Sequence, residues 1–321
     1  MEFISILGGY FSSIILCFAF GWLSYWFFRK FTAKLQSRIG PPWYQPIADV
    51  IKLMGKEFFV PGLANRLVYI VAPFVGLSVI MVLSFIIPPG VADWIGSYSW
   101  DLLVILYLSV LSSIVLVIAG AASASTWGKI GASRETAMIL SVELPLIISL
   151  LVPSIALRGT TFPSLSLNDI IKNQITGSFF GLPNWFIFRY PLAAIAMLAC
   201  ITTKIGVKPF GDIPEAEQEI IAGPLTEYGG PLLGIFEITK IMKFYVFSAL
   251  FVDLYLGGGD LFPFPLNVIS FLIKCFVIIV VITILDTISA RYRITDLPKW
   301  YLSACLVLAL VDLIRASLGG M

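Results

Sequence analysis

Repeated runs of apolar residues, each long enough to cross a lipid bilayer, constrain this chain more than any other feature. A membrane-spanning helix needs about 20 mostly apolar residues. Eight such runs lie between polar or Gly/Pro-rich breaks, at about 3–28, 67–87, 100–122, 135–157, 184–204, 230–256, 265–290 and 297–317. Hydrophobic residues make up 59% of the chain, above the roughly 45–50% of soluble domains. The sequence therefore predicts an all-α polytopic membrane protein with about eight transmembrane helices, forming a single membrane domain over residues 1–321.

The residue types that usually bind metals are scarce. The chain has no histidine, and its four cysteines lie singly within the predicted spans: Cys17, Cys200, Cys275 and Cys305. Zinc sites and iron–sulfur clusters need several cysteine or histidine ligands close together. We therefore expect this chain itself to bind no metal and no cofactor. Its formal net charge of +2 gives no indication of nucleic-acid binding.

Lysine and arginine are unevenly distributed among the segments that connect the runs. Cytoplasmic loops retain an excess of these residues. The richest loop, 29–66, contains Arg29, Lys30, Lys34, Arg38, Lys52, Lys56 and Arg66. The loops after the third, fifth and seventh runs also contain Lys or Arg, whereas two of the three alternate loops contain neither. We therefore expect a multi-pass protein of the cell membrane with both termini outside.

The loop 29–66 is predicted to contain an amphipathic helix. In WYQPIADVIKLMGKEFF, the apolar residues Ile47, Val50, Ile51 and Met54 recur at helical spacing, opposite a charged face. Two placements remain open for this helix. It lies at the membrane surface, or it lies against a partner protein.

A second cytoplasmic loop, residues 205–229, is unusually acidic. Within PFGDIPEAEQEIIAGPLTEYGG it holds five carboxylates: Asp212, Glu215, Glu217, Glu219 and Glu227. Pro214 with acids around it is typical of a helix N-terminus, where the helix dipole favours negative charge. A helix beginning there places Glu215 and Glu219 one above the other, where like charges repel unless a base intervenes or one is protonated. The apolar residues between them indicate that this helix packs inward.

Charged residues also occur inside the predicted spans. A carboxylate near the bilayer centre costs about 2.5–3.5 kcal/mol on insertion scales, so each one suggests a partner, water or a function. Glu143 lies in SVELPLIISLL, with Glu135 two turns earlier on nearly the same face. For Glu143 we favour a place in an ion pathway over a structural pair with a lysine. Glu237 and Lys240, three residues apart, lie side by side on a helix, and here an ion pathway and a local ion pair are equally supported.

Four motifs occur together in one order along the chain. They are RxGP in SRIGPPWYQPIADVIKLMGKE, SxE in GASRETAMILSVELPLIISLL, and PEAExE and EY in PFGDIPEAEQEIIAGPLTEYGG, followed by ARYRITDLPKW near the end. In these residues the chain resembles the eight-helix membrane subunit that anchors the peripheral arm of respiratory complex I and of the related energy-converting membrane-bound hydrogenases. The resemblance runs nearly end to end.

The resemblance implies partners and a path for protons. The implied partners are a hydrophilic subunit with the terminal iron–sulfur cluster, a hydrogenase-like large subunit and antiporter-like membrane subunits. Iron–sulfur clusters, and in the hydrogenase branch a nickel–iron site, then belong to those partners. The implied path uses Glu143, Glu215, Glu217, Glu219 and Glu227, to which the residue patterns add Glu135, Asp212 and Glu237 as candidates. Arg38 and Arg134 are implied charge partners near the docking face.

Two positions depart from the quinone-reducing pattern of this family. Lys204, five residues before Pro209, and Lys240 stand where such relatives have glutamates. These exchanges favour a ferredoxin-linked complex that reduces protons or sulfur compounds and translocates protons or sodium. A quinone-site subunit remains the alternative. A stand-alone secondary ion transporter is a further alternative, but it would show inverted repeats, and the sequence contains no internal repeat.

Overall fold

The computed structural model describes residues 2–90, 98–157, 164–175, 178–179, 182–259 and 266–318. The described part is almost entirely helical, which confirms the predicted fold class. Its helices are α1 (Glu2–Leu35), α2 (Gln45–Met54), α3 (Arg66–Ile86), α4 (Asp101–Ala122), α5 (Thr126–Ala156), α6 (Leu167–Ile175), α7 (Phe186–Arg189), α8 (Pro191–Ile205), α9 (Glu217–Ile220), η1 (Gly223–Leu225), α10 (Gly230–Tyr255), α11 (Leu266–Ile288), α12 (Leu297–Trp300), η2 (Tyr301–Cys305) and α13 (Leu306–Ser317). Two short strands, β1 (Ser178–Phe179) and β2 (Leu182–Pro183), pair antiparallel.

Six stretches of the described residues are long and apolar enough to cross a bilayer. They are Gly8–Leu35 of α1, then α3, α4, α5 and α11, and the continuous segment Leu297–Ser317 of α12 to α13. Two further helices occupy the remaining predicted runs. The helix α10 has 26 residues but contains several charged side chains, and α8 has only 15 residues. Each of the eight predicted apolar runs therefore contains one long helix of the fold.

Some predicted helix boundaries are wrong. The helix α5 begins at Thr126, not near residue 135, because its first turns are polar and helix formation does not end where the apolar run ends. The predicted run 184–204 is broken at Tyr190, and α8 begins at Pro191, which is tolerated at a first helical position. The helix α1 continues to Leu35, so Arg29, Lys30 and Lys34 lie on its last turns.

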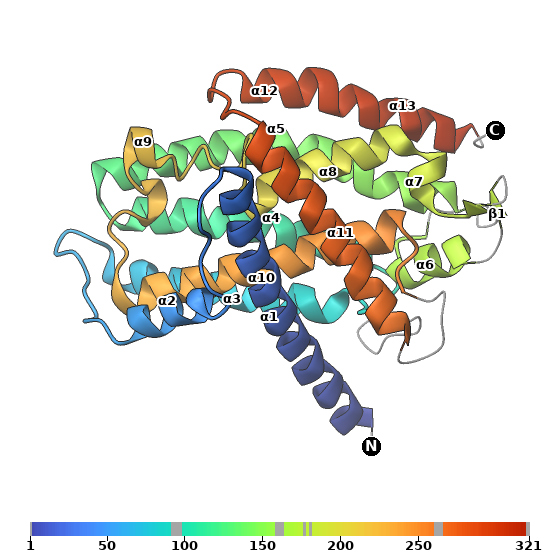
Figure 1. Ribbon diagram of the computed structural model, residues 1–321. Coiled ribbons are helices and arrows are strands. Elements are labelled where there is room, and N and C mark those ends of the chain that lie inside the picture. Colours follow the sequence, from blue (N-terminus) through green and yellow to red (C-terminus); the bar gives the residue numbers. More distant parts are fainter. Residues whose placement is uncertain are drawn as a thin grey trace.

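The helix α10 lies in the centre of the molecule. Every residue from Ile241 to Tyr255 is buried, as expected for a helix that is apolar on all sides. It packs against α1, α3, α8 and α11, and α1 and α11 cross it at a steep angle (Figure 1). A side chain at Gly21 of α1 would meet the carbonyl oxygen of Ile241 at 2.6 Å, so this crossing depends on glycine.

The two predicted cytoplasmic segments lie at the same end of the helix bundle. Figure 1 places α2 and α9 at one end, and α6, α7 and β1 at the opposite end. The predicted amphipathic helix is confirmed as α2, which packs against α10 and α1. The side chains of Ile51 and Met54 remain exposed.

Candidate functional site

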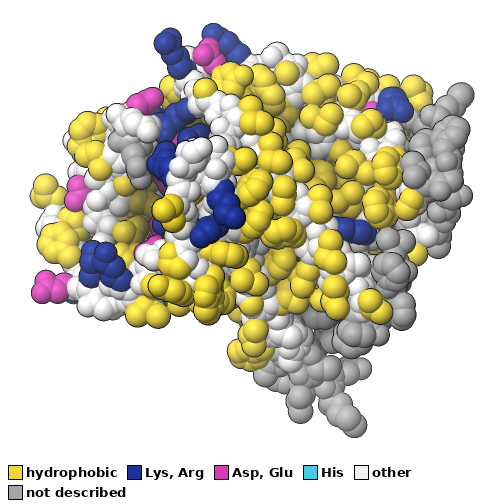
Figure 2. Space-filling model, viewed as in Figure 1, with side chains coloured by type: hydrophobic (Ala, Val, Ile, Leu, Met, Phe, Trp, Pro, Cys, Tyr) yellow, Lys and Arg dark blue, Asp and Glu magenta, His cyan; other side chains and the backbone are white. Residues whose placement is uncertain are grey.

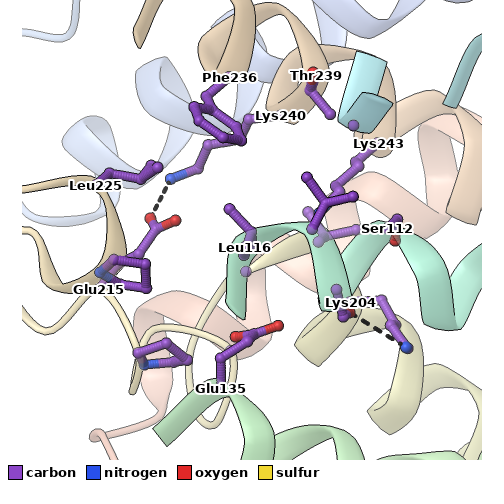
Figure 3. A pocket seen from close by; sticks show the side chains of 18 of the residues that line it. Ser112, Leu116, Glu135, Lys204, Glu215, Leu225, Phe236, Thr239, Lys240 and Lys243 are labelled. Carbon is purple, nitrogen blue, oxygen red and sulfur yellow. Dashed lines mark hydrogen bonds and ion pairs between the residues drawn. The ribbon is translucent and has the colours of Figure 1, made fainter. Parts of the chain in front are cut away.

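A polar cavity lies inside the bundle at the end that carries α2 and α9. Its volume is about 50 Å³, which is room for a few water molecules, since one water needs about 10–15 Å³. The walls come from α4, α5, α8, α10 and the acidic loop 205–229 (Figure 3). Its charged lining residues are Glu135, Glu215, Glu237, Lys204, Lys240 and Lys243. The structure thus brings three of the predicted glutamates and both unusual lysines together.

The ammonium group of Lys204 on α8 forms an ion pair with the carboxylate of Glu143 on α5. It also lies 3.4 Å from the carbonyl oxygen of Ser109 and 3.4 Å from the hydroxyl oxygen of Ser113, both on α4. The second carboxylate oxygen of Glu143 is buried and has no hydrogen-bond partner among the described residues. Glu143 therefore has the lysine partner that the structural alternative required, and one oxygen remains able to accept a proton.

The ammonium group of Lys240 on α10 forms an ion pair with the carboxylate of Glu215, at 3.0 Å. Glu237 lies three residues before Lys240 but, within the described residues, forms no ion pair with it. The prediction of a local Glu237–Lys240 pair is therefore wrong, because Glu215 reaches Lys240 from the acidic loop. Burial raises the pKa of the Glu215 carboxyl, but the charge and hydrogen bond of Lys240 lower it further, so the pKa lies below its ordinary value.

Glu135 on α5 and Lys243 on α10 line the same cavity and are both buried. In the described part of the chain neither of them forms a direct ion pair. The charge that acts most strongly on Glu135 is that of Lys243, and Glu135 acts most strongly on Lys243. Sequence reasoning assigned no role to Lys243. Its position one turn after Lys240, on the same face of an intramembrane helix, was the available signal.

The acidic loop does not form the predicted helix. The helix α9 begins at Glu217, with Ala216 as its N-cap, so Pro214 lies outside it. Glu215 and Glu219 are consequently not stacked at helical spacing. Glu215 turns inward to Lys240, whereas Glu219 turns outward and forms an ion pair with Arg134 of α5. The side chain of Glu217 lies outside the described residues.

Arginines from outside the loop fix its other side chains. Arg291, in the segment after α11, forms an ion pair with Asp212 and donates a 2.7 Å hydrogen bond to Gln218. Arg134 also lies 3.5 Å from the carbonyl oxygen of Ile213. Distant cations, not helix dipoles, thus hold the acids of this loop. The sequence alone did not indicate Arg291 as one of these cations.

The EY motif fixes the end of the loop through backbone contacts. The Tyr69 hydroxyl of α3 donates a 2.6 Å hydrogen bond to the carbonyl oxygen of Glu227. The rings of Tyr69 and Tyr228 stack at 4.1 Å. The carboxylate of Glu227 does not line the cavity. The structure therefore places the backbone of this motif, and not its acid, against the helix bundle.

Two wider clefts adjoin the cavity at the bundle surface. One, of about 300 Å³, shares Lys240 with the cavity and also contains Asp212 and Arg291. The other, of about 350 Å³, shares Glu237 with it and also contains Arg29 of α1. Figure 2 shows Lys/Arg and Asp/Glu side chains in a hollow at this end of the molecule. Arg38 is exposed and lines neither cleft.

No group of three or more His, Cys, Asp or Glu residues in the described ranges is arranged to hold a metal ion. The cavity lining instead combines equal numbers of lysines and glutamates with the hydroxyls of Ser112, Ser113 and Thr239. Such groups exchange protons or orient water. Chemically, the arrangement is suited to moving protons through a charge-balanced, water-sized space.

Known proteins resemble this chain in sequence and in fold. The family model described as NADH dehydrogenase matches residues 10–317. A membrane component of the NADH-quinone oxidoreductase of Thermomicrobium roseum is 36% identical over 267 residues, covering 77% of this chain and 76% of that protein. A chain in the structure of the membrane-bound sulfane sulfur reductase, an archaeal respiratory membrane complex, matches with a TM-score of 0.85 and 25% identity, covering 98% of this chain and 100% of that one. The chain therefore belongs to the NADH dehydrogenase family and is a membrane subunit of a complex I-like oxidoreductase.

Proposed function

We propose that this chain couples electron transfer in a docked peripheral arm to ion translocation. The observation that carries the proposal is the cavity of about 50 Å³ lined by three lysines and three glutamates. Sites for organic ligands usually have about 300–1,000 Å³, whereas this cavity has room only for water. Within this chain, the cavity therefore supports a path for protons better than a site for a quinone ring.

The polar path has two ends. Toward the bundle surface, Lys240 and Glu237 connect the cavity to the two wider clefts. Toward the side of the bundle, Lys204 leads to Glu143, and the exposed apolar residues Leu140 and Leu144 flank Glu143 on α5. The path thus ends just beneath a lateral apolar face, where an antiporter-like membrane subunit would continue it. The hydrophilic subunit with the terminal iron–sulfur cluster would cover the end with α2 and α9.

The membrane orientation follows from the same assignment. The positive residues of 29–66 and the acidic loop lie at one end of the bundle (Figure 1). Cytoplasmic segments retain lysine and arginine, so we place this end in the cytoplasm and both termini outside. Accessibility of cysteines introduced near residues 58 and 168 to an impermeant reagent, in intact cells and in inverted vesicles, tests this orientation.

For the electron acceptor, we favour protons or sulfur compounds, with reduced ferredoxin as donor and a hydrogenase-like large subunit in the arm. Two observations support this branch: Lys204 and Lys240 are both ion-paired inside the cavity, and one similar fold belongs to a sulfane sulfur reductase. The second candidate is a quinone-site subunit. It is favoured by the 36% identity to a component of an NADH-quinone oxidoreductase, and the quinone would then bind between this chain and its soluble neighbour. A stand-alone transporter has no comparable support.

The test is a measurement of ion translocation by the whole complex in liposomes. Replacing both members of the Lys204–Glu143 pair by glutamine keeps their size and the total charge. We expect electron transfer to continue while ions translocated per electron fall by about tenfold or more. The matched control replaces the exposed surface pair Lys299–Asp296 by glutamine and asparagine. An unchanged ratio in the Lys204–Glu143 double variant would refute the proposal, and quinone-dependent activity of the complex would favour the second candidate.

A further inference from the structure

The cavity contains two fixed ion pairs and two charged residues left between them. Lys204 is paired with Glu143, and Lys240 is paired with Glu215. Lys243 and Glu135 line the same cavity, are buried, and form no direct ion pair in the described ranges. On the basis of the function proposed above, we infer that Lys243 and Glu135 are the proton-exchanging centre of the path, and that the species moved between them is a proton and not a sodium ion.

The separation of Lys243 and Glu135 supports exchange. Each is the strongest charge acting on the other, yet no direct contact holds the proton on the lysine. The cavity that both line has room for a few water molecules. Ser112, Ser113 and Thr239 place hydroxyl groups on its walls, and hydroxyl groups both donate and accept hydrogen bonds. A short chain of water and hydroxyls can therefore connect the ammonium to the carboxylate.

Burial makes two protonation states of this pair comparable in energy. In a low-dielectric site, an ammonium and a carboxylate that do not touch are both costly to keep charged, and the neutral forms compete with them. A directly bonded pair lacks this freedom, because the contact stabilises both charges. The water-separated pair is therefore the member of the cavity suited to exchange, while the direct pairs hold the helices at fixed positions.

The step balances in protons and in charge. One proton leaves the Lys243 ammonium and one arrives at the Glu135 carboxylate, so the cavity keeps its total charge. Lys243, now a neutral amine, takes up a proton from the side of Glu215. Glu135, now a neutral carboxylic acid, releases its proton toward Glu143. The surrounding charges that bias this exchange are Lys204 from α8, Glu215 from the acidic loop, and Glu237 and Lys240 from α10, with Glu143 behind Lys204.

Sodium does not fit the same place. A hard cation in a protein is usually surrounded by several oxygen ligands, often carboxylates and carbonyls. Here two of the carboxylates are already neutralised by ammonium groups, and the described residues contain no cluster of three acids suited to a metal ion. The lysine ammonium groups occupy the positions that a sodium ion would need.

The test compares two replacements of Lys243 in the whole complex reconstituted in liposomes. Arginine keeps the positive charge but does not release its proton in proteins, whereas methionine removes the charge. If Lys243 only balanced charge, Lys243→Arg would behave as the unmodified complex. We expect Lys243→Arg and Lys243→Met both to lower protons translocated per electron by about tenfold or more. Lys299→Arg, at an exposed surface position, is the matched control.

A second measurement covers the case in which a Lys243 variant fails to assemble. Redox-induced infrared difference spectra of the intact complex should contain a protonated-carboxyl band that Glu135→Gln removes. The inference fails if Lys243→Arg keeps the normal ratio, or if the band persists in Glu135→Gln. If the Lys204–Glu143 double variant stops translocation while Lys243→Arg does not, only this inference fails. If both keep translocating, the proposed function fails as well.

Discussion

Two lysine–glutamate ion pairs border the same cavity, and they differ in how much water reaches them. The side chains of Lys204 and Glu143 are only 3% and 13% exposed. Those of Lys240 and Glu215 are 31% and 29% exposed, and Lys240 also faces a cleft of about 300 Å³. The same chemical groups therefore form a pair locked in the bundle and a pair that water can compete with. The comparison indicates a fixed inner end of the path and a switchable outer end.

The strongest way to break this comparison is to remove one charge of the buried pair. Glu143→Gln leaves the Lys204 ammonium buried without a counter-charge, and such a change typically costs about 3–5 kcal/mol. We expect a clear fall in the thermal unfolding midpoint of the purified complex. The double replacement of Lys204 and Glu143 by glutamine is the control and should be more stable than the single variant. Equal midpoints for the single and double variants would contradict the proposed burial of this pair.

The same change at the partly exposed pair should be milder. In Glu215→Gln, water from the neighbouring cleft can solvate the Lys240 ammonium. Exposed pairs contribute about 0.2–1 kcal/mol, so we expect a loss near the upper end of that range. The unfolding midpoint of the same purified complex measures it. A destabilisation as large as that of Glu143→Gln would mean that the two pairs are equally buried.

The pH dependence of the Glu215 pair sharpens the comparison further. The pKa of Glu215 is lower in the folded protein than its ordinary value of 4.5, because Lys240 outweighs the effect of burial. The unfolded state therefore binds the proton more tightly, and the stabilisation is fully present above pH 4.5 and is lost as the pH falls through the depressed value. The difference in stability between the unmodified complex and Glu215→Gln should shrink on acidification. A difference that grows as the pH falls would have the wrong sign.

The smallest expected effect concerns the ion pair at the rim of the loop. Glu219, paired with Arg134, is 53% exposed. Salt shortens the range of charge interactions from about 10 Å at 0.1 M to about 3 Å at 1 M. We expect Arg134→Gln to cost a few tenths of a kcal/mol at low salt, up to about 1 kcal/mol, and nothing measurable at high salt. Lys204 variants should keep their destabilisation at both salt concentrations, and a matching salt response would place that pair in water.

The acidic loop explains why part of the site could not be predicted. The Pro214 and acid pattern is typical of a helix start, but local preference is a weak determinant. Arg291 and Arg134 come from segments 79 and 85 residues away and bind Asp212 and Glu219. Those long-range ion pairs decide the backbone path, and α9 consequently begins three residues after Pro214. By contrast, the helix α2 was predictable because its apolar spacing alone defines the face that packs against α10.

The sequence by itself determined the membrane class, the eight apolar segments, the amphipathic helix and the family, because these depend on composition, periodicity and motif order. It also marked Lys204 and Lys240 as unusual. Only the tertiary structure decided their partners, Glu143 at a separation of 61 residues and Glu215 at 25, and left Lys243 opposite Glu135 across a water-sized cavity. The physical reason is that charge pairing between helices depends on their rotation and depth in the bundle, which packing of distant segments fixes and local patterns do not encode.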